Sequence, residues 1–121
     1  LTWYQKAAGQ GYAPAQVNLA ALYAEGQGGV AQDFQQALRW YREAADQGYA
    51  PACFNLGVIC AEGQGGVERD LSMAYVWFSR AAVLGDEDAL SAQKQVGARL
   101  TAAQKSQAQQ LLQQPISKRP I

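Results

Sequence analysis

One long segment of the chain recurs at a fixed interval with its glycines, aspartate, tryptophan and alanine pair in register. Residues 26–48 read GQGGVAQDFQQALRWYREAADQG, and residues 63–85 follow the same pattern 37 residues later. The three tryptophans, Trp3, Trp40 and Trp77, keep the same interval. Of the 37 positions from 11 to 47, 19 carry the same residue one period later. A constant period of this length is typical of solenoids, in which each unit packs mainly on its neighbours.

Each unit is predicted to form two helices joined by a glycine-rich loop. In the first full unit, residues 12–48, Pro14 lies in the first turn of a helix that ends near residue 25. The loop contains Gly26, Gly28 and Gly29, and Asp33 is a good N-cap for the second helix. Apolar residues recur there at spacings of three and four, as in an amphipathic helix. The second full unit, residues 49–85, repeats this order.

The two ends of the chain depart from the full unit. Residues 1–11 match the second helix of a truncated unit. Residues 86–114 form a degenerate third unit, in which Gln93 and Lys94 replace the Leu56 and Gly57 of the unit before. Thr101 and Gln104 predict a capping box, followed by a glutamine-rich helix of the kind that closes a solenoid. We therefore expect one solenoid domain over residues 1–114 and a tail at 115–121.

Composition excludes several classes of function. Ten basic residues balance ten acidic ones, so no net field favours nucleic acid or an anionic membrane. No apolar run approaches the ~20 residues that a membrane-spanning helix needs. The sequence begins at Leu1 in mid-pattern, so we expect that the natural N-terminus, with any export signal, is missing. The compartment is left open between the cytoplasm and an exported location.

Cys53 and Cys60 are predicted to be reduced packing residues. They lie seven residues apart on one helix, which places their Cα atoms roughly 10 Å apart, beyond the reach of a disulfide. The alternative is a metal or redox pair, but the sequence has no histidine and no third cysteine to complete a metal site. Free thiols weakly favour a reducing compartment.

The motifs that suggest catalysis each have a structural explanation. Without histidine, a Ser-His-Asp or Cys-His arrangement cannot form within this chain. The glycine loop follows no strand and precedes no Gly-Lys-Ser/Thr, so it does not resemble a phosphate loop. Asp33 and Asp70 are better explained as helix caps, and the acidic run 86–88 as the start of a helix. We predict no enzyme activity, no cofactor and no metal.

The repeated pattern resembles a known family. Ala-x-x-x-Leu-[Ala/Gly]-x-x-[Tyr/Cys]-x-x-Gly-x-Gly-Gly-Val-x-x-Asp-x-x-x-Ala-x-x-Trp-[Tyr/Phe]-x-x-Ala-Ala-x-x-Gly runs over residues 15–48 and 52–85. It is similar to the Sel1-like repeat, a relative of the tetratricopeptide repeat, over residues 1–112. The closing Leu-Thr-Ala-Ala-Gln-Lys is similar to the last helix of bacterial members. The usual unit is one residue shorter, and the extra glycine predicts only a longer loop. The resemblance implies an all-α, right-handed superhelical solenoid of antiparallel helix pairs, with about six helices.

The same resemblance implies a peptide-binding face. In related tetratricopeptide domains, an asparagine directly before the Leu-[Ala/Gly] pair bonds a bound peptide. Asn18 and Asn55 match that position, whereas the third unit has Ala92. The alternative is that each asparagine bonds the neighbouring repeat. Asp88 stands where peptide-clamping relatives often carry a basic residue, which argues against a carboxylate clamp.

We define the predicted groove as the first-helix positions left free at spacings of three and four. Its residues are Val17, Asn18, Ala21, Glu25, Phe54, Asn55, Val58, Glu62, Ser91, Gln95 and Arg99.

The function expected from this resemblance is that of a non-enzymatic adaptor with a protein or peptide partner. Two alternatives remain open, a docking or regulatory arm of a larger enzyme and a purely structural spacer. Weak self-association is also expected, through the apolar surface that the truncated N-terminal helix leaves uncovered.

Overall fold

The computed structural model describes residues 2–27, 29, 31–66 and 68–113, and over these residues it contains seven helices and no strand. The helices are α1 (Thr2–Gly9), α2 (Ala13–Glu25), α3 (Phe34–Asp46), α4 (Ala50–Glu62), α5 (Leu71–Val83), α6 (Glu87–Gly97) and α7 (Ala102–Leu112). The all-α solenoid predicted from the repeat is confirmed. The sequence predicts about six helices; the count of seven includes both helices of the degenerate third unit and the short α1. The expected tail, residues 115–121, lies outside the described residues.

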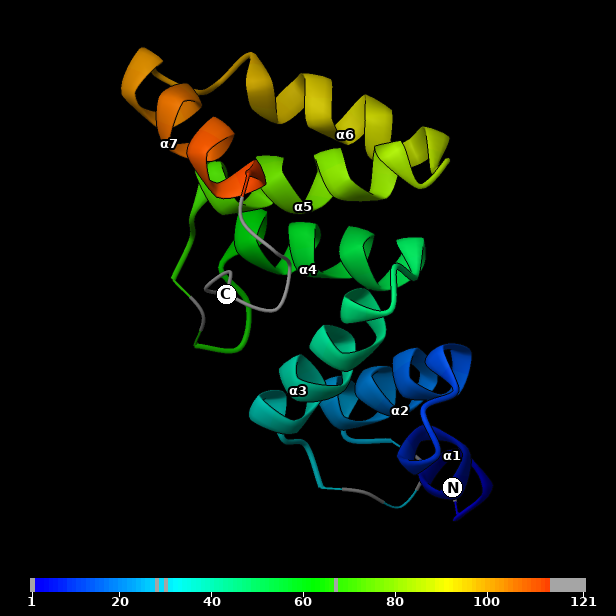
Figure 1. The fold of residues 1–121 in the computed structure, drawn as a ribbon. Helices are drawn as coiled ribbons and strands as arrows, with labels where there is room; N and C mark the ends of the chain where they lie inside the picture. Colours follow the sequence, from blue (N-terminus) through cyan, green and yellow to red (C-terminus); the bar gives the residue numbers. More distant parts are fainter. Residues whose placement is uncertain (1, 28, 30, 67, 114–121) are drawn as a thin grey trace.

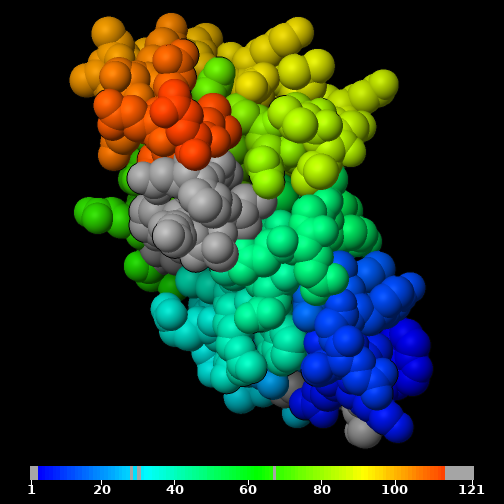
Figure 2. Space-filling model, in the orientation of Figure 1, coloured from blue at the N-terminus to red at the C-terminus, as the bar shows by residue number. Residues whose placement is uncertain are grey.

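From α1 to α6, the helices follow one another along the molecule in chain order. Figure 1 shows α1 and α2 at one end, α3 and α4 in the middle, and α5, α6 and α7 at the other end. Within the full units, α2 packs on α3 and α4 packs on α5, while α3 also packs on α4 and joins the two units. The colour order along the surface in Figure 2 shows the same arrangement. Each unit therefore contacts mainly its neighbours, as expected for a solenoid.

Short-range signals start the helices where the sequence predicts. An Asp33 side-chain oxygen accepts hydrogen bonds from the backbone N–H groups of Gln35 and Gln36, at 3.1 and 3.2 Å. Asp70 caps α5 in the same way, accepting from the N–H of Met73 at 3.1 Å. These bonds satisfy donors that have no partner inside the helix. Asp86 caps α6, so the explanation of the acidic run as a helix start is also confirmed.

The loops between paired helices repeat as closely as the helices do. The backbone N–H of Asp33 donates to the carbonyl of Tyr23, and that of Asp70 to the carbonyl of Cys60, each at 2.9 Å. A tight turn is needed to bring these groups together, and it uses glycine at positive φ, 84° at Gly29 and 85° at Gly66. Gly28 and Val30, which belong to the first of these loops, lie outside the described residues.

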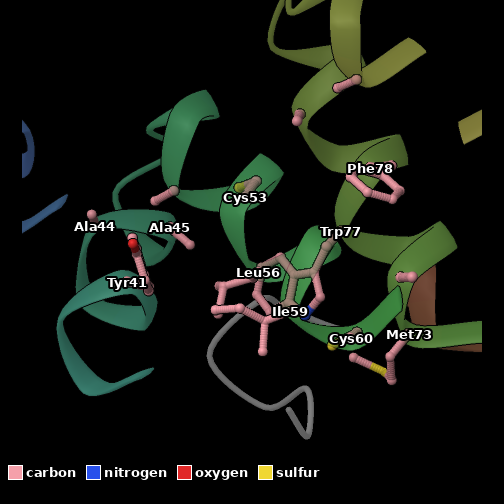
Figure 3. Close-up of a cluster of buried hydrophobic side chains, with 14 of the residues drawn as sticks. Tyr41, Ala44, Ala45, Cys53, Leu56, Ile59, Cys60, Met73, Trp77 and Phe78 are labelled. Atoms are coloured by element: carbon pink, nitrogen blue, oxygen red, sulfur yellow. The ribbon is translucent and has the colours of Figure 1, made fainter. Parts of the chain in front are cut away.

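The main core lies between α3, α4 and α5. Figure 3 shows side chains from these three helices meeting around Trp77, which is fully buried. The alanine pair of α3 is also fully buried, which lets α4 approach closely. Burial of this apolar surface is the main term that favours folding. The labelled members are Tyr41, Ala44, Ala45, Cys53, Leu56, Ile59, Cys60, Met73, Trp77 and Phe78.

The third unit is assembled differently from the other two. α7 packs on α5, and α6 and α7 do not form the close antiparallel pair seen in α2/α3 and α4/α5. The predicted capping box begins α7, with the Thr101 hydroxyl accepting from the N–H of Gln104 at 3.2 Å and the Gln104 side chain accepting in return at 2.9 Å. Ala108 is buried beneath α7, whereas most of its other residues are exposed. α7 therefore closes the stack with a polar outer surface.

Candidate binding surface

The residues of the predicted groove occupy matched positions on α2, α4 and α6, except Arg99, which lies in the turn just after α6. Within each of these helices they fall within about 100° around the axis, at 3.6 residues per turn. None of the eleven is fully buried. Asn18 is exposed and Asn55 half-buried, and neither side chain makes a hydrogen bond within the part of the chain that the structure describes. The alternative, in which each asparagine bonds the neighbouring repeat, therefore gains no support here.

The apolar members of the predicted groove are partly used by the core. Val17, Phe54 and Val58 are half-buried and pack against the main cluster. The ring of Phe54 lies 5.5 Å from that of Phe78 on α5, at an angle of 56°. Tilted aromatic pairs at this distance attract each other. Only the outer surface of Phe54 is therefore available to a ligand. Ala21 on α2 is also half-buried.

The polar members lie nearer the surface. Glu25 and Glu62 end α2 and α4, and both are exposed. A Glu62 carboxylate oxygen accepts from the side-chain amide of Gln64 at 2.8 Å. Burial raises the pKa of the Tyr41 phenol, and the charge of Glu25 adds to that rise, so Glu25 lies close enough to act on α3. Ser91 and Gln95 on α6 and Arg99 in the turn after it are all exposed.

Both cysteines are reduced and buried, as predicted. Burial raises the pKa of the Cys60 thiol to about 12, and the carboxylate of Asp70 adds to the rise. Because the thiolate is the nucleophile and the metal ligand, Cys60 is inert near neutral pH. No cluster of three or more potential metal ligands occurs in the described residues.

Two hollows between α5, α6 and α7 were not predicted from the sequence. The smaller has a volume of about 270 Å³, and we call it the basic hollow; it is lined by Tyr75, Gln93, Lys94, Gly97, Lys105 and Gln109. The larger, about 470 Å³, we call the apolar hollow; Arg80, Val83, Leu90, Gln93 and Leu112 are among its lining residues. The sequence feature that goes with these hollows is the replacement of Leu56 and Gly57 by Gln93 and Lys94 in the third unit. From the sequence alone, this replacement indicates only that the third unit is degenerate.

Comparison with known families identifies the repeat. The family model for the Sel1 repeat matches residues 1–12, 13–49 and 50–86, which is more than half of the chain. The chain belongs to the Sel1 repeat family. Sel1 repeat proteins generally mediate protein–protein interactions, and the fold is typically a non-catalytic scaffold. No curated protein matches the chain. None of the described helices combines the length and apolar character needed to cross a lipid bilayer.

Two solved Sel1 repeat structures are similar to the chain. One is c5321, a protective antigen of uropathogenic Escherichia coli strains with an SLR fold; it is 40% identical over 97% of this chain, with a TM-score of 0.85. The other, a Sel1 repeat protein from Oxalobacter formigenes, is 39% identical over 76% of this chain, with a TM-score of 0.68. The chain spans 25% of the first protein and 37% of the second. It therefore corresponds to a few repeats of either relative.

Proposed function

We propose that this Sel1 repeat chain is a non-enzymatic scaffold that binds a short extended peptide in the predicted groove. The general role of the family in protein–protein interaction supports the class of function. The observation that carries the finer proposal is the pair Asn18 and Asn55, at matched positions on α2 and α4. Their side-chain amides make no hydrogen bond within the described residues. An amide can donate to and accept from a peptide backbone at the same time.

The surroundings of the two asparagines indicate the kind of peptide. The exposed part of Phe54 and Val58 offers a small apolar centre, and the carboxylates of Glu25 and Glu62 lie at its edge. We therefore propose a ligand with an apolar side chain and a basic residue. Few large anchors are available, and because such anchors carry most of the energy of an interface, the affinity is expected to be modest.

The proposal is tested with peptides selected from a random library displayed on phage against the wild-type chain. Their affinity is then measured for the variant Asn18→Ala with Asn55→Ala, and for a control, Gln35→Ala with Gln107→Ala, which removes two exposed amides outside the groove. We expect binding to weaken at least tenfold in the first variant and to change less than twofold in the control. Circular dichroism checks that both variants fold. Undiminished binding by a folded asparagine variant would remove the groove as the site and favour the spacer alternative.

Self-association is a second proposed interaction, and it rests on α1. Trp3 is 65% exposed, whereas the corresponding Trp40 is half-buried and Trp77 is fully buried. Trp77 packs beside α4, the first helix of its own unit, and residues 1–11 contain no such helix before α1. A large exposed aromatic surface favours association with a second copy.

A further inference from the structure

The basic hollow and the apolar hollow are neighbours and share one wall. Gln93, in the middle of α6, lines both of them. α5 and α6 run antiparallel, so Tyr75 and Gly97 lie towards one end of the shared wall and Val83 and Leu90 towards the other. α7 contributes Lys105 to the first hollow and Leu112 to the second. Together the two hollows make a continuous binding region with a cationic end and an apolar end.

This region exists because α6 carries polar residues where the other first helices carry apolar ones. Leu19 and Ala20 of α2 are buried, and so are Leu56 and Gly57 of α4. A Cβ atom at Gly57 would lie 2.7 Å from the ring of Phe78, which shows how closely α4 and α5 approach. The matched residues of α6 are Gln93, which is half-buried, and Lys94, which is exposed. They leave α6 without an apolar surface on which α7 can pack, and α7 packs on α5 instead.

The charges in the basic hollow are uncompensated. Lys94 and Lys105 both line it, no carboxylate does, and neither lysine takes part in an ion pair within the described part of the chain. The side-chain N–H of Gln93 donates to the Ser79 hydroxyl at 2.7 Å, which fixes the amide and leaves its carbonyl oxygen as an acceptor. An anionic group from a ligand would accept hydrogen bonds from the ammonium groups of the two lysines.

The apolar hollow has the opposite character. Val83 is 82% exposed and Leu90 is 43% exposed, both unusual for large apolar side chains on one surface. Arg80 also lines it, and the buried Nε atom of Arg80 has no hydrogen-bond acceptor among the described residues. A peptide segment would supply an apolar side chain to cover Val83 and Leu90.

We propose that the joined hollows bind an extended peptide segment that carries a carboxylate side chain and an apolar side chain two residues apart. Leu90 and Lys94 are one turn apart on α6, a rise of about 6 Å. Side chains at positions i and i+2 of an extended chain lie on the same side, about 6.7 Å apart. The carboxylate then lies between Lys94 and Lys105, and the apolar side chain lies against Val83 and Leu90.

This site is distinct from the predicted groove. On α6, the direction midway between Leu90 and Lys94 lies about 100° around the helix axis from the direction midway between Ser91 and Gln95, so the two sites use adjacent faces of the helix. The preferred ligands also differ in charge, because the groove is edged by Glu25 and Glu62 and the basic hollow by two lysines. The two proposals can therefore fail separately.

The test uses nuclear magnetic resonance titrations of the 121-residue chain with the peptide acetyl-Ser-Thr-Leu-Thr-Glu-Thr-Ser-amide at low salt. We expect the largest shifts at the backbone amides of Leu90, Lys94 and Gly97, with those of Asn18 and Asn55 unchanged. Replacing the peptide's glutamate by glutamine, or its leucine by serine, should weaken binding at least fivefold. Shifts confined to the predicted groove, or no shifts at all, would overturn the proposal.

A matched pair of variants separates a specific site from general attraction. Lys94→Gln with Lys105→Gln should weaken peptide binding at least tenfold. The control, Lys6→Gln with Arg69→Gln, removes two exposed cations elsewhere and should change it less than twofold. Equal losses in both variants would show that only net charge matters and would overturn the proposal. Binding of a phosphoserine peptide but not of the glutamate peptide would also overturn it, in favour of a phosphopeptide site.

Discussion

Phe34 and Gly65 make one of the close contacts between neighbouring units. Phe34 is the first residue of α3, and Gly65 lies in the loop before α5, one unit later. A Cβ atom at Gly65 would overlap the ring of Phe34. Gly65 also has a φ of 59°, in the left-handed region that favours glycine. The repeated glycine is therefore needed for packing between units as well as for the turn.

Gly65→Ala is expected to lower the free energy of unfolding by about 1–3 kcal/mol, because the new methyl group displaces the Phe34 ring. Gly66→Ala is the matched control, since Gly66 also has a positive φ, 85°, but has open space where a Cβ atom would lie. This variant should lose only about 1 kcal/mol of unfolding free energy, from the strain of a positive φ in alanine. Urea unfolding monitored by circular dichroism measures both. Adding Phe34→Ala should remove most of the difference; equal losses at the two glycines would contradict the contact.

The Cys60 thiol makes the free energy of unfolding depend on pH in the alkaline range. Its pKa is raised from 9.0 to about 12 in the folded chain, so between these values the unfolded chain loses a proton that the folded chain keeps. The stabilisation that the protonated thiol gives the folded chain is thus fully present below pH 9 and is lost as the pH rises towards 12. The free energy of unfolding falls over this range by at most about 1.4 kcal/mol per pH unit. The raised pKa of Tyr41 acts in the same direction.

The measurement compares wild type with Cys60→Ala by urea unfolding at several pH values between 8 and 11. Both proteins retain Tyr41, so the difference between the two curves isolates the thiol. We expect the wild type to lose stability more steeply above pH 9 than the variant does. Parallel curves would mean that the thiol titrates alike in the folded and unfolded chains.

At the scale of whole helices, the distance between paired helices is set by one small residue. In the second full unit, α4 presents Gly57 to the ring of Phe78 on α5. The corresponding residues of the first full unit are Ala20 and Tyr41, and both are buried. In both units, a small residue on the first helix thus faces an aromatic residue on the second helix. This pairing keeps the two helices close enough to bury the core.

Gly57→Ala is expected to destabilise the chain by about 1–3 kcal/mol, because the methyl group would overlap the Phe78 ring. The change should be unfavourable even though alanine favours helix over glycine by about 1 kcal/mol. Gly9→Ala is the control: Gly9 also lies in a helix, and nothing lies within 4 Å of its added Cβ. That substitution should leave the melting temperature unchanged or raise it. A rise for Gly57→Ala as well would show that α4 and α5 can move apart at little cost.

At the scale of the whole molecule, the two ends of the stack differ. The outer surface of α7 is polar, whereas α1 exposes Trp3. Because a solenoid buries its apolar surface only between successive units, a polar cap ends it and an apolar end invites another helix.

Sedimentation velocity should show weak, concentration-dependent association of the wild-type chain, because a second copy can cover Trp3. Trp3→Ser should shift the midpoint of association at least fivefold towards higher concentration. Tyr12→Ser is the control, since Tyr12 is 55% exposed but is not part of α1. A strict monomer at high concentration would remove the inference about α1 and leave the fold unaffected.

The sequence by itself determined the repeat, the helices and their ends. Asp33, Asp70 and Thr101 cap helices through backbone groups two or three residues away, and glycines turn the chain between helices. Such signals act within a few residues, so they can be interpreted without knowing the rest of the fold. The predicted groove follows from the same register, and its role in binding stays a prediction.

Only the tertiary structure decided how the third unit packs. In this unit α7 packs on α5 rather than on α6, and Lys94 and Lys105 line one hollow. Both features depend on contacts between segments that are distant in the chain. The substitution of Leu56–Gly57 by Gln93–Lys94 was visible in the sequence, but its consequence was not. A repeat predicts where a helix lies only while its packing residues are kept, because the position of a helix is set by the apolar surface that it can bury.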